Sequence, residues 1–392
     1  MLKGKMVIGQ SGGPTVVINQ SLVGAVLAAR GEAAITGILG ARHGVAGIMN
    51  EDFVDLDAPS KEQLELVAAT PAAALGSVRL KPGKAECERV FEAFRKHDVR
   101  YFFYIGGNDS AETANIIAGM ARDADYEFRT VHIPKTIDND LRVTDHCPGF
   151  ASAARFVALA FMGDDRDNAA LPGVKINVVM GRHAGFLTAA SALARQADGD
   201  GPHLIYLPER PFDVAQFAVD VRRVYGEFGR CVVAVSEGVA DADGNPIVTT
   251  GERDSHGNVQ LSGTGALGDV LASHAKKAFE GEKVRVRADT FGYLQRSFPT
   301  VVSEVDAREA REVGAFAVRH AVKGDEDGSV AIRRLASEPY ASEYFITPLS
   351  TVARETRSMD DAFIHAEGND VTAAWLDYLR PLVGELPRIG RL

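Results

Sequence analysis

The sequence predicts an α/β protein built of two Rossmann-like lobes with mostly parallel sheets. Short apolar runs recur along the chain, each followed by a glycine-rich turn and often by an Ala- and Leu-rich amphipathic stretch, which is typical of repeated strand–loop–helix units. The runs are continuously apolar rather than alternating, as expected for parallel strands covered by helices on both faces. A domain usually has about 100–200 residues, so a chain of 392 residues indicates two lobes.

The predicted elements follow in order along the chain. The first strand, over residues 6–9, leads through a Gly-Gly-Pro turn into a helix over 17–30, where Val23, Val26 and Leu27 share one helical face. The other predicted strands are residues 99–105, 130–133, 174–180 and 231–235. Helices are expected after the second and fourth of these five strands, over residues 110–121 and 184–194.

Composition and charge narrow the range of functions. Lys and Arg number 43 against 53 Asp and Glu, so the formal net charge is −10. A protein that binds nucleic acid through its phosphates needs an excess of cations, and we expect no nucleic-acid partner. With 46% hydrophobic and 24% charged residues, the chain resembles ordinary globular proteins and differs from disordered ones.

The cysteine and hydropathy patterns bear on location. Cys87, Cys147 and Cys231 lie far apart with no C-x-x-C pair, which predicts neither a disulfide framework nor a thiolate zinc site and fits a reducing cytoplasm. The N-terminal apolar run ends at Gly9, so no signal peptide is expected. No stretch reaches the ~18 uncharged apolar residues that a bilayer-spanning helix needs. We therefore expect a cytoplasmic protein without a membrane partner.

Glycines and polar residues gather where the predicted strands end, which is where parallel sheets bind their ligands. After the first strand, Gly12 and Gly13 would let backbone N–H groups approach an anion at a helix N-terminus, although an ordinary strand–helix turn has the same composition. The turn matches neither G-x-G-x-x-G nor G-x-x-x-x-G-K-[ST]. After the second strand, the Gly-Gly-Asn-Asp-Ser turn over 106–110 suits a phosphate or its magnesium, or alternatively an Asn-Asp helix cap.

The turn after the third strand is the most informative. Residues 134–140 combine Lys135 and two alternating carboxylates, Asp138 and Asp140. One carboxylate can accept a proton from a substrate hydroxyl and the other can help to hold a metal. A solvated acidic turn would also explain the carboxylates, but less naturally the lysine beside them.

Later strand ends add cations. Arg182 follows the fourth strand and can bind a phosphate or balance charge during its transfer, and Glu237 follows the fifth and can accept hydrogen bonds from sugar hydroxyls. A cluster of guanidinium, phenol and amide groups then indicates a phosphate ester: Arg285, Arg287, Tyr293, Gln295 and Arg296. Each residue alone fits a salt-bridged surface, but together they indicate phosphoryl transfer to a phosphorylated sugar.

The strings T-I-D-N-D at 136–140 and M-G-R at 180–182 resemble the phosphofructokinase family, and the similarity extends from the first Gly-Gly turn to at least Arg296. The resemblance implies a phosphofructokinase-type fold. It implies Asp138 as the general base at the 1-hydroxyl of fructose 6-phosphate, with Lys135 and Arg182 as further catalytic residues. The implied sugar-phosphate residues are Thr136, Ile137, Asp138, Met180, Gly181, Arg182, Glu237, Arg287, Tyr293 and Arg296. The implied donor residues are Gly12, Gly13, Arg79, Gly107, Asp109 and Ser110.

The same resemblance implies Mg²⁺, an oligomer and a division of the chain. Asn108, which stands where the family usually has a metal-binding aspartate, and Asp140 would hold Mg²⁺. Arg287 resembles an arginine that reaches the substrate of a neighbouring subunit, so a homodimer or homotetramer is expected. The donor lobe would comprise residues 1–149 and roughly 298–345, and the sugar-phosphate lobe residues 150–297 and roughly 346–392.

Two positions decide which phosphoryl donor is expected. The ATP-using branch of the family has glycine where this chain has Asp109 and Lys135, and both changes resemble the pyrophosphate-using branch. Asp109 places bulk and charge where the α-phosphate of ATP would lie, and like charges ~4 Å apart cost up to ~4 kcal/mol at an effective dielectric of ~20. We expect reversible, Mg²⁺-dependent transfer from diphosphate to fructose 6-phosphate, giving fructose 1,6-bisphosphate. The alternatives are an ATP-dependent enzyme, another acceptor such as sedoheptulose 7-phosphate, or a regulatory protein without catalysis, whose expected loss of Asp138 is not seen.

Overall fold

The computed structural model describes residues 2–248, 265–324, 326–353 and 355–391, and the chain divides into two compact units. Unit 1 comprises Met1–Phe150 and Arg296–Arg357, and unit 2 comprises Ala151–Gln295 and Ser358–Leu392. The chain returns to unit 2 after Arg357, which is later than the boundary near residue 345 that the sequence suggested. The reason is that residues beyond 345 still pair within unit 1: the last strand of this unit runs to Thr347, and Thr356 forms a β-bridge with Leu141.

Unit 1 contains a seven-stranded sheet in the order β11-β10-β5-β4-β1-β2-β3. The five inner strands are parallel to one another, and the two edge strands are antiparallel to their neighbours. The inner strands are β10 (Gly328–Ser337), β5 (Arg129–Pro134), β4 (Val99–Gly106), β1 (Gly4–Gln10) and β2 (Ile35–Ala41), and the edge strands are β11 (Tyr340–Thr347) and β3 (Phe53–Asp55).

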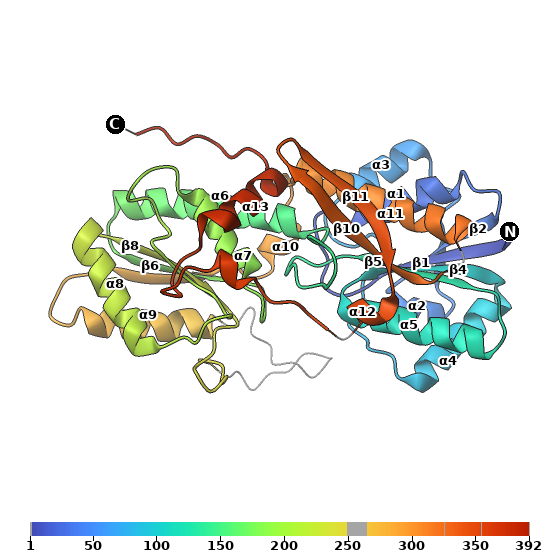
Figure 1. Cartoon of the computed structure of the whole chain (residues 1–392), viewed down its shortest axis with the longest axis horizontal. Helices are drawn as coiled ribbons and strands as arrows, with labels where there is room; N and C mark the ends of the chain where they lie inside the picture. The colour runs from blue at the N-terminus through green and yellow to red at the C-terminus, as the bar shows by residue number, and fades with distance from the viewer. Residues whose placement is uncertain (1, 249–264, 325, 354, 392) are drawn as a thin grey trace. The chain divides into compact units, whose positions relative to one another are not determined.

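Helices cover both faces of this sheet (Figure 1). Successive residues of a strand point to opposite faces, so Met6 and Ile8 pack with one helix layer while Val7 packs with the other. The first layer is α1 (Ile18–Ala29), α3 (Lys61–Ala69) and α11 (Glu304–Lys323); the second is α2 (Val45–Met49), α4 (Lys84–Lys96) and α5 (Asn108–Asp123), with the short α12 (Leu349–Val352) beside α5. Two buried faces explain why these strands read as continuous apolar runs.

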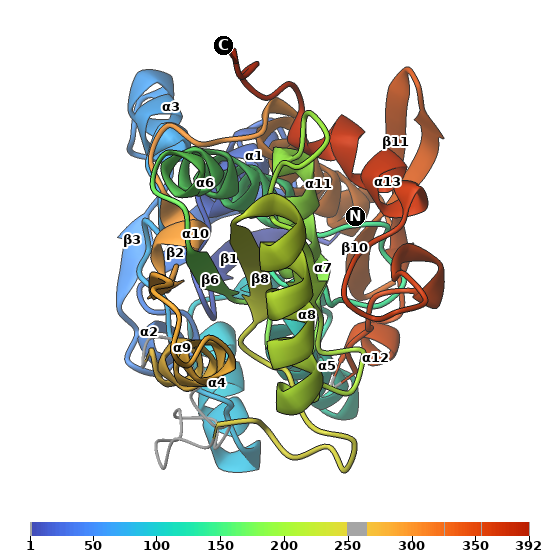
Figure 2. The ribbon, with the colours of Figure 1, turned by 90° about the vertical axis from the view of Figure 1, so that its left-hand side faces the viewer.

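Unit 2 contains a parallel sheet in the order β7-β8-β6-β9. Its strands are β7 (Leu204–Tyr206), β8 (Cys231–Ser236), β6 (Val174–Val179) and β9 (Val286–Thr290). Two helices, α8 (Val214–Phe228) and α9 (Ala266–Ala278), cover one face, and α6 (Phe150–Ala170) covers the other (Figure 2). The remaining elements are α7 (Phe186–Ala189), η1 (Ala190–Ala194), α10 (Leu294–Ser297), η2 (Asp361–Phe363) and α13 (Ala373–Val383).

The predicted α/β class with mostly parallel sheets is confirmed. All five predicted strands are observed, as are the first two predicted helices. The helix expected over 184–194 is instead a short α7 followed by the 3-10 helix η1. None of the helices in the described ranges is long and apolar enough to cross a membrane.

Candidate active site

In unit 1 the three polar turns of the sequence analysis follow β1, β4 and β5, which are adjacent in the sheet. Because these strands are parallel, their carboxyl ends lie at one edge of the sheet, and so do the turns. Backbone hydrogen bonds connect them: Ser11 N donates to Ile105 O (2.9 Å), and Lys135 N donates to Gly106 O (2.9 Å). The local sequences that end these strands therefore build one site in this unit.

Lys135 is a buried cation at the end of β5. Its side chain donates from Nζ to the carbonyl oxygen of Gly13 (2.8 Å), and the residue is only 4% exposed. Burial, together with the nearby Arg296 guanidinium, lowers the pKa of Lys135 to about 8, although the carboxylates of Asp138 and Asp140 act in the opposite direction. The ammonium group is thus close enough to both carboxylates and to a guanidinium to interact with each of them.

Gly12 and Gly13 allow the side chains of Lys135 and Arg296 to lie close to the backbone of the first turn. Gly12 has φ +77°, in the left-handed region, and a Cβ there would lie 3.2 Å from Lys135 Nζ. A Cβ on Gly13 would lie 2.6 Å from Arg296 Nη1. The Gly-Gly turn therefore lies against two cations. The charge of a further cation, Arg79, also lowers the pKa of Lys135. This arrangement suits a small polyanion.

The second turn opens α5. Its N-cap is Gly107, which makes no side-chain cap hydrogen bond, so the helix-cap alternative for Asn108 and Asp109 is not observed. Asn108, Asp109 and Ser110 are instead the first three helical residues, where backbone N–H groups attract anions. A Cβ on Gly106 would overlap the Ser110 side chain, which explains the glycine at that position.

Asp109 has a cationic partner that the sequence did not reveal. Lys81 Nζ lies 3.5 Å from Asp109 Oδ1 and 2.9 Å from Oε2 of the buried Glu112. The hydrogen bond to Glu112 is the main reason that the pKa of Lys81 is raised. Since the Asp109 side chain is 39% exposed and paired, solvent and Lys81 screen its charge, and its repulsion of a nucleotide is weaker than that of an isolated carboxylate.

The third turn alternates buried and accessible residues. Ile137 and Asn139 are buried, whereas Asp138 and Asp140 are partly exposed. Asp138 N donates to Thr136 Oγ1 (3.1 Å). The alternation brings both carboxylates to the accessible side of the loop, as a base and a metal ligand require.

In unit 2, Met180, Gly181 and Arg182 follow β6. Gly181 and Arg182 both have positive φ, +148° and +52°, and their N–H groups donate to Glu237 Oε1 at 3.4 and 3.3 Å. Glu237, which is 6% exposed, thus holds this turn together. A Cβ on Gly238 would overlap the carbonyl oxygen of Arg182, so Gly238 is a structural requirement of the turn that sequence reasoning missed.

Arg287 and Tyr293 lie in and beyond β9 in the same unit. Arg287 is exposed and donates to Val286 O (2.9 Å). Tyr293, 42% exposed, lines a cavity of about 450 Å³ together with Asp269 and Asp289. Both side chains are thus accessible, and their sugar-phosphate roles stay predictions.

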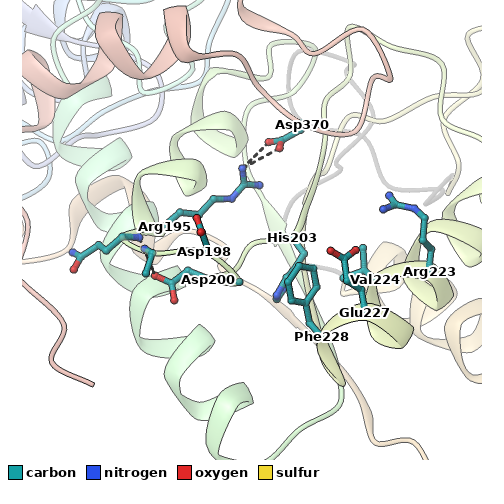
Figure 3. Close-up of a pocket in the computed structure, with 12 residues that line it drawn as sticks. Arg195, Asp198, Asp200, His203, Arg223, Val224, Glu227, Phe228 and Asp370 are labelled. Carbon is teal, nitrogen blue, oxygen red and sulfur yellow. Dashed lines mark hydrogen bonds and ion pairs between the residues drawn. The ribbon is translucent and has the colours of Figure 1, made fainter. Parts of the chain in front are cut away.

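A second cavity of unit 2, of about 480 Å³, was not anticipated (Figure 3). It lies beside the amino ends of β7 and β8, whereas ligands of parallel sheets bind at the carboxyl ends. Arg195 donates to both carboxylate oxygens of Asp370 at its rim (2.9 and 3.0 Å). Burial lowers the pKa of His203 in its wall to about 4, so this imidazole is neutral.

Comparison with known proteins agrees with the geometry. The phosphofructokinase family model matches residues 5–321. The chain is 59% identical to the pyrophosphate–fructose 6-phosphate 1-phosphotransferase of Rhodospirillum rubrum, covering 100% of this chain and 97% of that protein. It is 39% identical to the protein of the same name from Xanthomonas campestris, covering 99% and 93%.

A solved structure gives the same result. The pyrophosphate-dependent phosphofructokinase of Nitrosospira multiformis superposes with a TM-score of 0.87 at 34% identity, covering 99% of this chain and 94% of that one. The resemblance inferred from the T-I-D-N-D and M-G-R strings is therefore confirmed. The chain belongs to the phosphofructokinase family.

Proposed function

We propose that this protein transfers a phosphoryl group from diphosphate to the 1-hydroxyl of fructose 6-phosphate, reversibly and with Mg²⁺. The observation that carries the proposal is Lys135, a buried ammonium group bonded to the Gly-Gly turn beside Arg296. Such a group suits a compact anion such as diphosphate and replaces contacts that a nucleotide would otherwise make. The names of the two relatives support the same donor and acceptor.

Each functional group has a proposed role. Asp138 accepts the proton of the 1-hydroxyl, and Lys135 and Arg182 stabilise the charge on the transferring phosphoryl group. Gly12, Gly13, Arg79, Gly107, Asp109 and Ser110 form the donor side. Thr136, Ile137, Met180, Gly181, Arg182, Glu237, Arg287, Tyr293 and Arg296 hold the sugar phosphate. The protein is also proposed to form a homodimer or homotetramer.

The side chains available to ligate a metal fit Mg²⁺. No group of three or more His, Cys, Asp or Glu side chains that could hold a metal occurs in the described part of the chain. Mg²⁺ commonly binds through one or two carboxylates, substrate phosphates and water, which suits Asp140 and the amide of Asn108. When bound, Mg²⁺ would neutralise diphosphate oxygens; Asn108, being uncharged, would contribute less than an aspartate.

Donor choice is tested by replacing Asp109 and Lys135 together with glycine. We expect kcat/KM with diphosphate to fall and activity with ATP to appear, because the bulk of Asp109 and the cation favouring a small donor are both removed. Initial rates with each donor measure the change. Asp123→Gly, at an exposed position of α5, controls for an unspecific effect on the helix. A double variant that keeps its diphosphate preference would show that other residues select the donor.

The pKa of Lys135 predicts an alkaline decline in activity. Its pKa of about 8 means that the ammonium is charged below this pH and neutral above it. Because kcat/KM reports the free enzyme, kcat/KM for diphosphate should fall as pH rises through about 8. In Lys135→Arg the group stays charged, and the decline should move to higher pH. An unchanged profile in that variant would assign the decline to another group.

The proposed activity is tested by supplying purified protein with fructose 6-phosphate, Mg²⁺ and either diphosphate or ATP, and measuring fructose 1,6-bisphosphate. We expect fructose 1,6-bisphosphate to form with diphosphate. Starting from fructose 1,6-bisphosphate and inorganic phosphate, we expect a measurable reverse reaction. Activity with ATP alone would overturn the donor assignment. Sedoheptulose 7-phosphate in place of fructose 6-phosphate, with sedoheptulose 1,7-bisphosphate as the product measured, tests the alternative acceptor.

A further inference from the structure

Arg357, the last residue of unit 1, binds the loop that carries the two aspartates. Its guanidinium donates to three carbonyl oxygens: from Nε to Asn139 (2.8 Å), from Nη1 to Thr144 (2.7 Å) and from Nη2 to Asp145 (2.8 Å). Its backbone N–H donates to the carbonyl oxygen of Asp140 (2.8 Å). One residue therefore makes four hydrogen bonds to the backbone of a seven-residue stretch.

This loop needs outside support because its backbone is strained. Asn139 has φ +60° and Val143 has φ +73°, and a β-branched residue in the left-handed region is an unusual outlier. The conformation of Val143 persists only when the surroundings fix it. Besides Arg357, the side chain of Asn139 contributes by accepting from Cys147 N (3.0 Å).

We propose that Arg357 is a positioning residue for catalysis: it fixes the backbone from which the Asp138 and Asp140 carboxylates project. Asp138 immediately precedes the carbonyl held by Nε, and the backbone of Asp140 is held directly. Arg357 lies outside residues 5–321, the part that matches the family model. The inference rests on the proposed role of Asp138.

An arginine is required because three carbonyls in different directions are bound by one planar group. The guanidinium presents five N–H donors in a fixed fork, whereas a lysine ammonium is a compact group on a flexible chain. Lysine keeps the positive charge but cannot reach all three oxygens with the same geometry. Arg357→Lys thus separates the loss of the fork from the loss of charge.

The test compares Arg357→Lys and Arg357→Ala with the wild-type protein in the diphosphate assay. A displacement of about 1 Å in a reacting group can cost about 10²-fold in rate, so we expect kcat of Arg357→Ala to fall by about 10²-fold with KM for fructose 6-phosphate little changed. Arg357→Lys should lose less. Guanidinium chloride at non-denaturing concentration should restore part of the kcat of Arg357→Ala. Arg308→Lys, an exposed arginine of α11, is the matched control and should behave as wild type.

Hydrogen exchange of the amides of residues 139–147 provides a readout besides activity. Faster exchange confined to these amides in both Arg357 variants is expected. Wild-type exchange there, a higher KM with normal kcat, or normal kinetics would each overturn the proposal. If the wild-type protein shows no diphosphate activity, the proposed function fails, and the exchange experiment still decides whether Arg357 orders the loop. If Arg357→Ala does not fold, Arg357→Lys carries both measurements.

Discussion

Asp138→Asn is expected to lower kcat by about 10²–10⁴-fold, the usual contribution of a general base. Asparagine has the same shape, but its amide cannot take the proton of the sugar hydroxyl. The loop should keep its conformation, because the bond from Asp138 to Thr136 Oγ1 is made by the backbone N–H and the flanking Ile137 and Asn139 are buried. KM for fructose 6-phosphate should therefore change little. Steady-state kinetics at saturating diphosphate measure both parameters.

Asp123→Asn makes the same chemical change at an exposed position of α5 and should leave kcat unaltered. A kcat of Asp138→Asn within a few-fold of the wild-type value would remove the general-base assignment. A loss of the same size in kcat/KM, with kcat unchanged, would instead show that the Asp138 carboxylate contributes to substrate binding.

His146→Gln is expected to lower the free energy of unfolding by about 3–5 kcal/mol, the range for breaking a buried ion pair by removing one partner. The His146 side chain is 1% exposed, with Nε2 2.5 Å from Glu309 Oε2 and Nδ1 2.8 Å from Asp145 Oδ2. The variant leaves the equally buried Glu309 carboxylate without its cation. Tyr340 and Ser342 still donate to the other oxygen of Glu309, but these groups are neutral.

The same ion pair predicts how stability depends on pH. Burial alone would lower the pKa of His146, but the hydrogen bonds to Asp145 and Glu309 outweigh it and raise the pKa to about 9. Because the pKa in the unfolded chain is about 6.5, the stabilisation is complete below pH ~6.5 and is lost as pH rises through about 9. The unfolding free energy of the wild-type protein should fall across this interval.

Urea unfolding at pH 6, 7.5 and 9.5 measures both effects. The control is His97→Gln, which breaks an exposed His–Glu pair of the same unit, with His97 Nε2 2.7 Å from Glu51 Oε2, and should change stability little. Equal stability of His146→Gln and wild type at pH 6 would contradict a charged His146. If the variant does not fold, the pH dependence of the wild type remains as the test.

Local sequence was sufficient where one segment carries the whole signal. The apolar runs of β1, β4 and β5 predicted buried parallel strands, and the T-I-D-N-D string identified the loop with Asp138. The antiparallel edge strands β3 and β11 each pair with the strand just before them in the chain. They were missed because β3 has three residues and most residues of β11 are accessible, so neither forms a continuous apolar run. Arg357 was missed for another reason, because its bonded carbonyls lie more than 200 residues earlier, and the pairing of Lys81 with Asp109 likewise depends on the path of the intervening chain. A single sequence does not encode such pairings in any local pattern.

The order of the strands has a consequence for synthesis of the chain. Strand β5 pairs on one side with β4, which precedes it, and on the other with β10, through Val131–Gly328 and His132–Ser329. Translation proceeds at about 5–20 residues per second, so ~200 residues between these strands take on the order of 10–40 s. During that time the nascent chain has an open edge on β5, and the intervening unit 2 is made first. The seven-stranded sheet of unit 1 is therefore completed only after β10 has emerged from the ribosome, and until then the unpaired edge of β5 is a surface prone to aggregation.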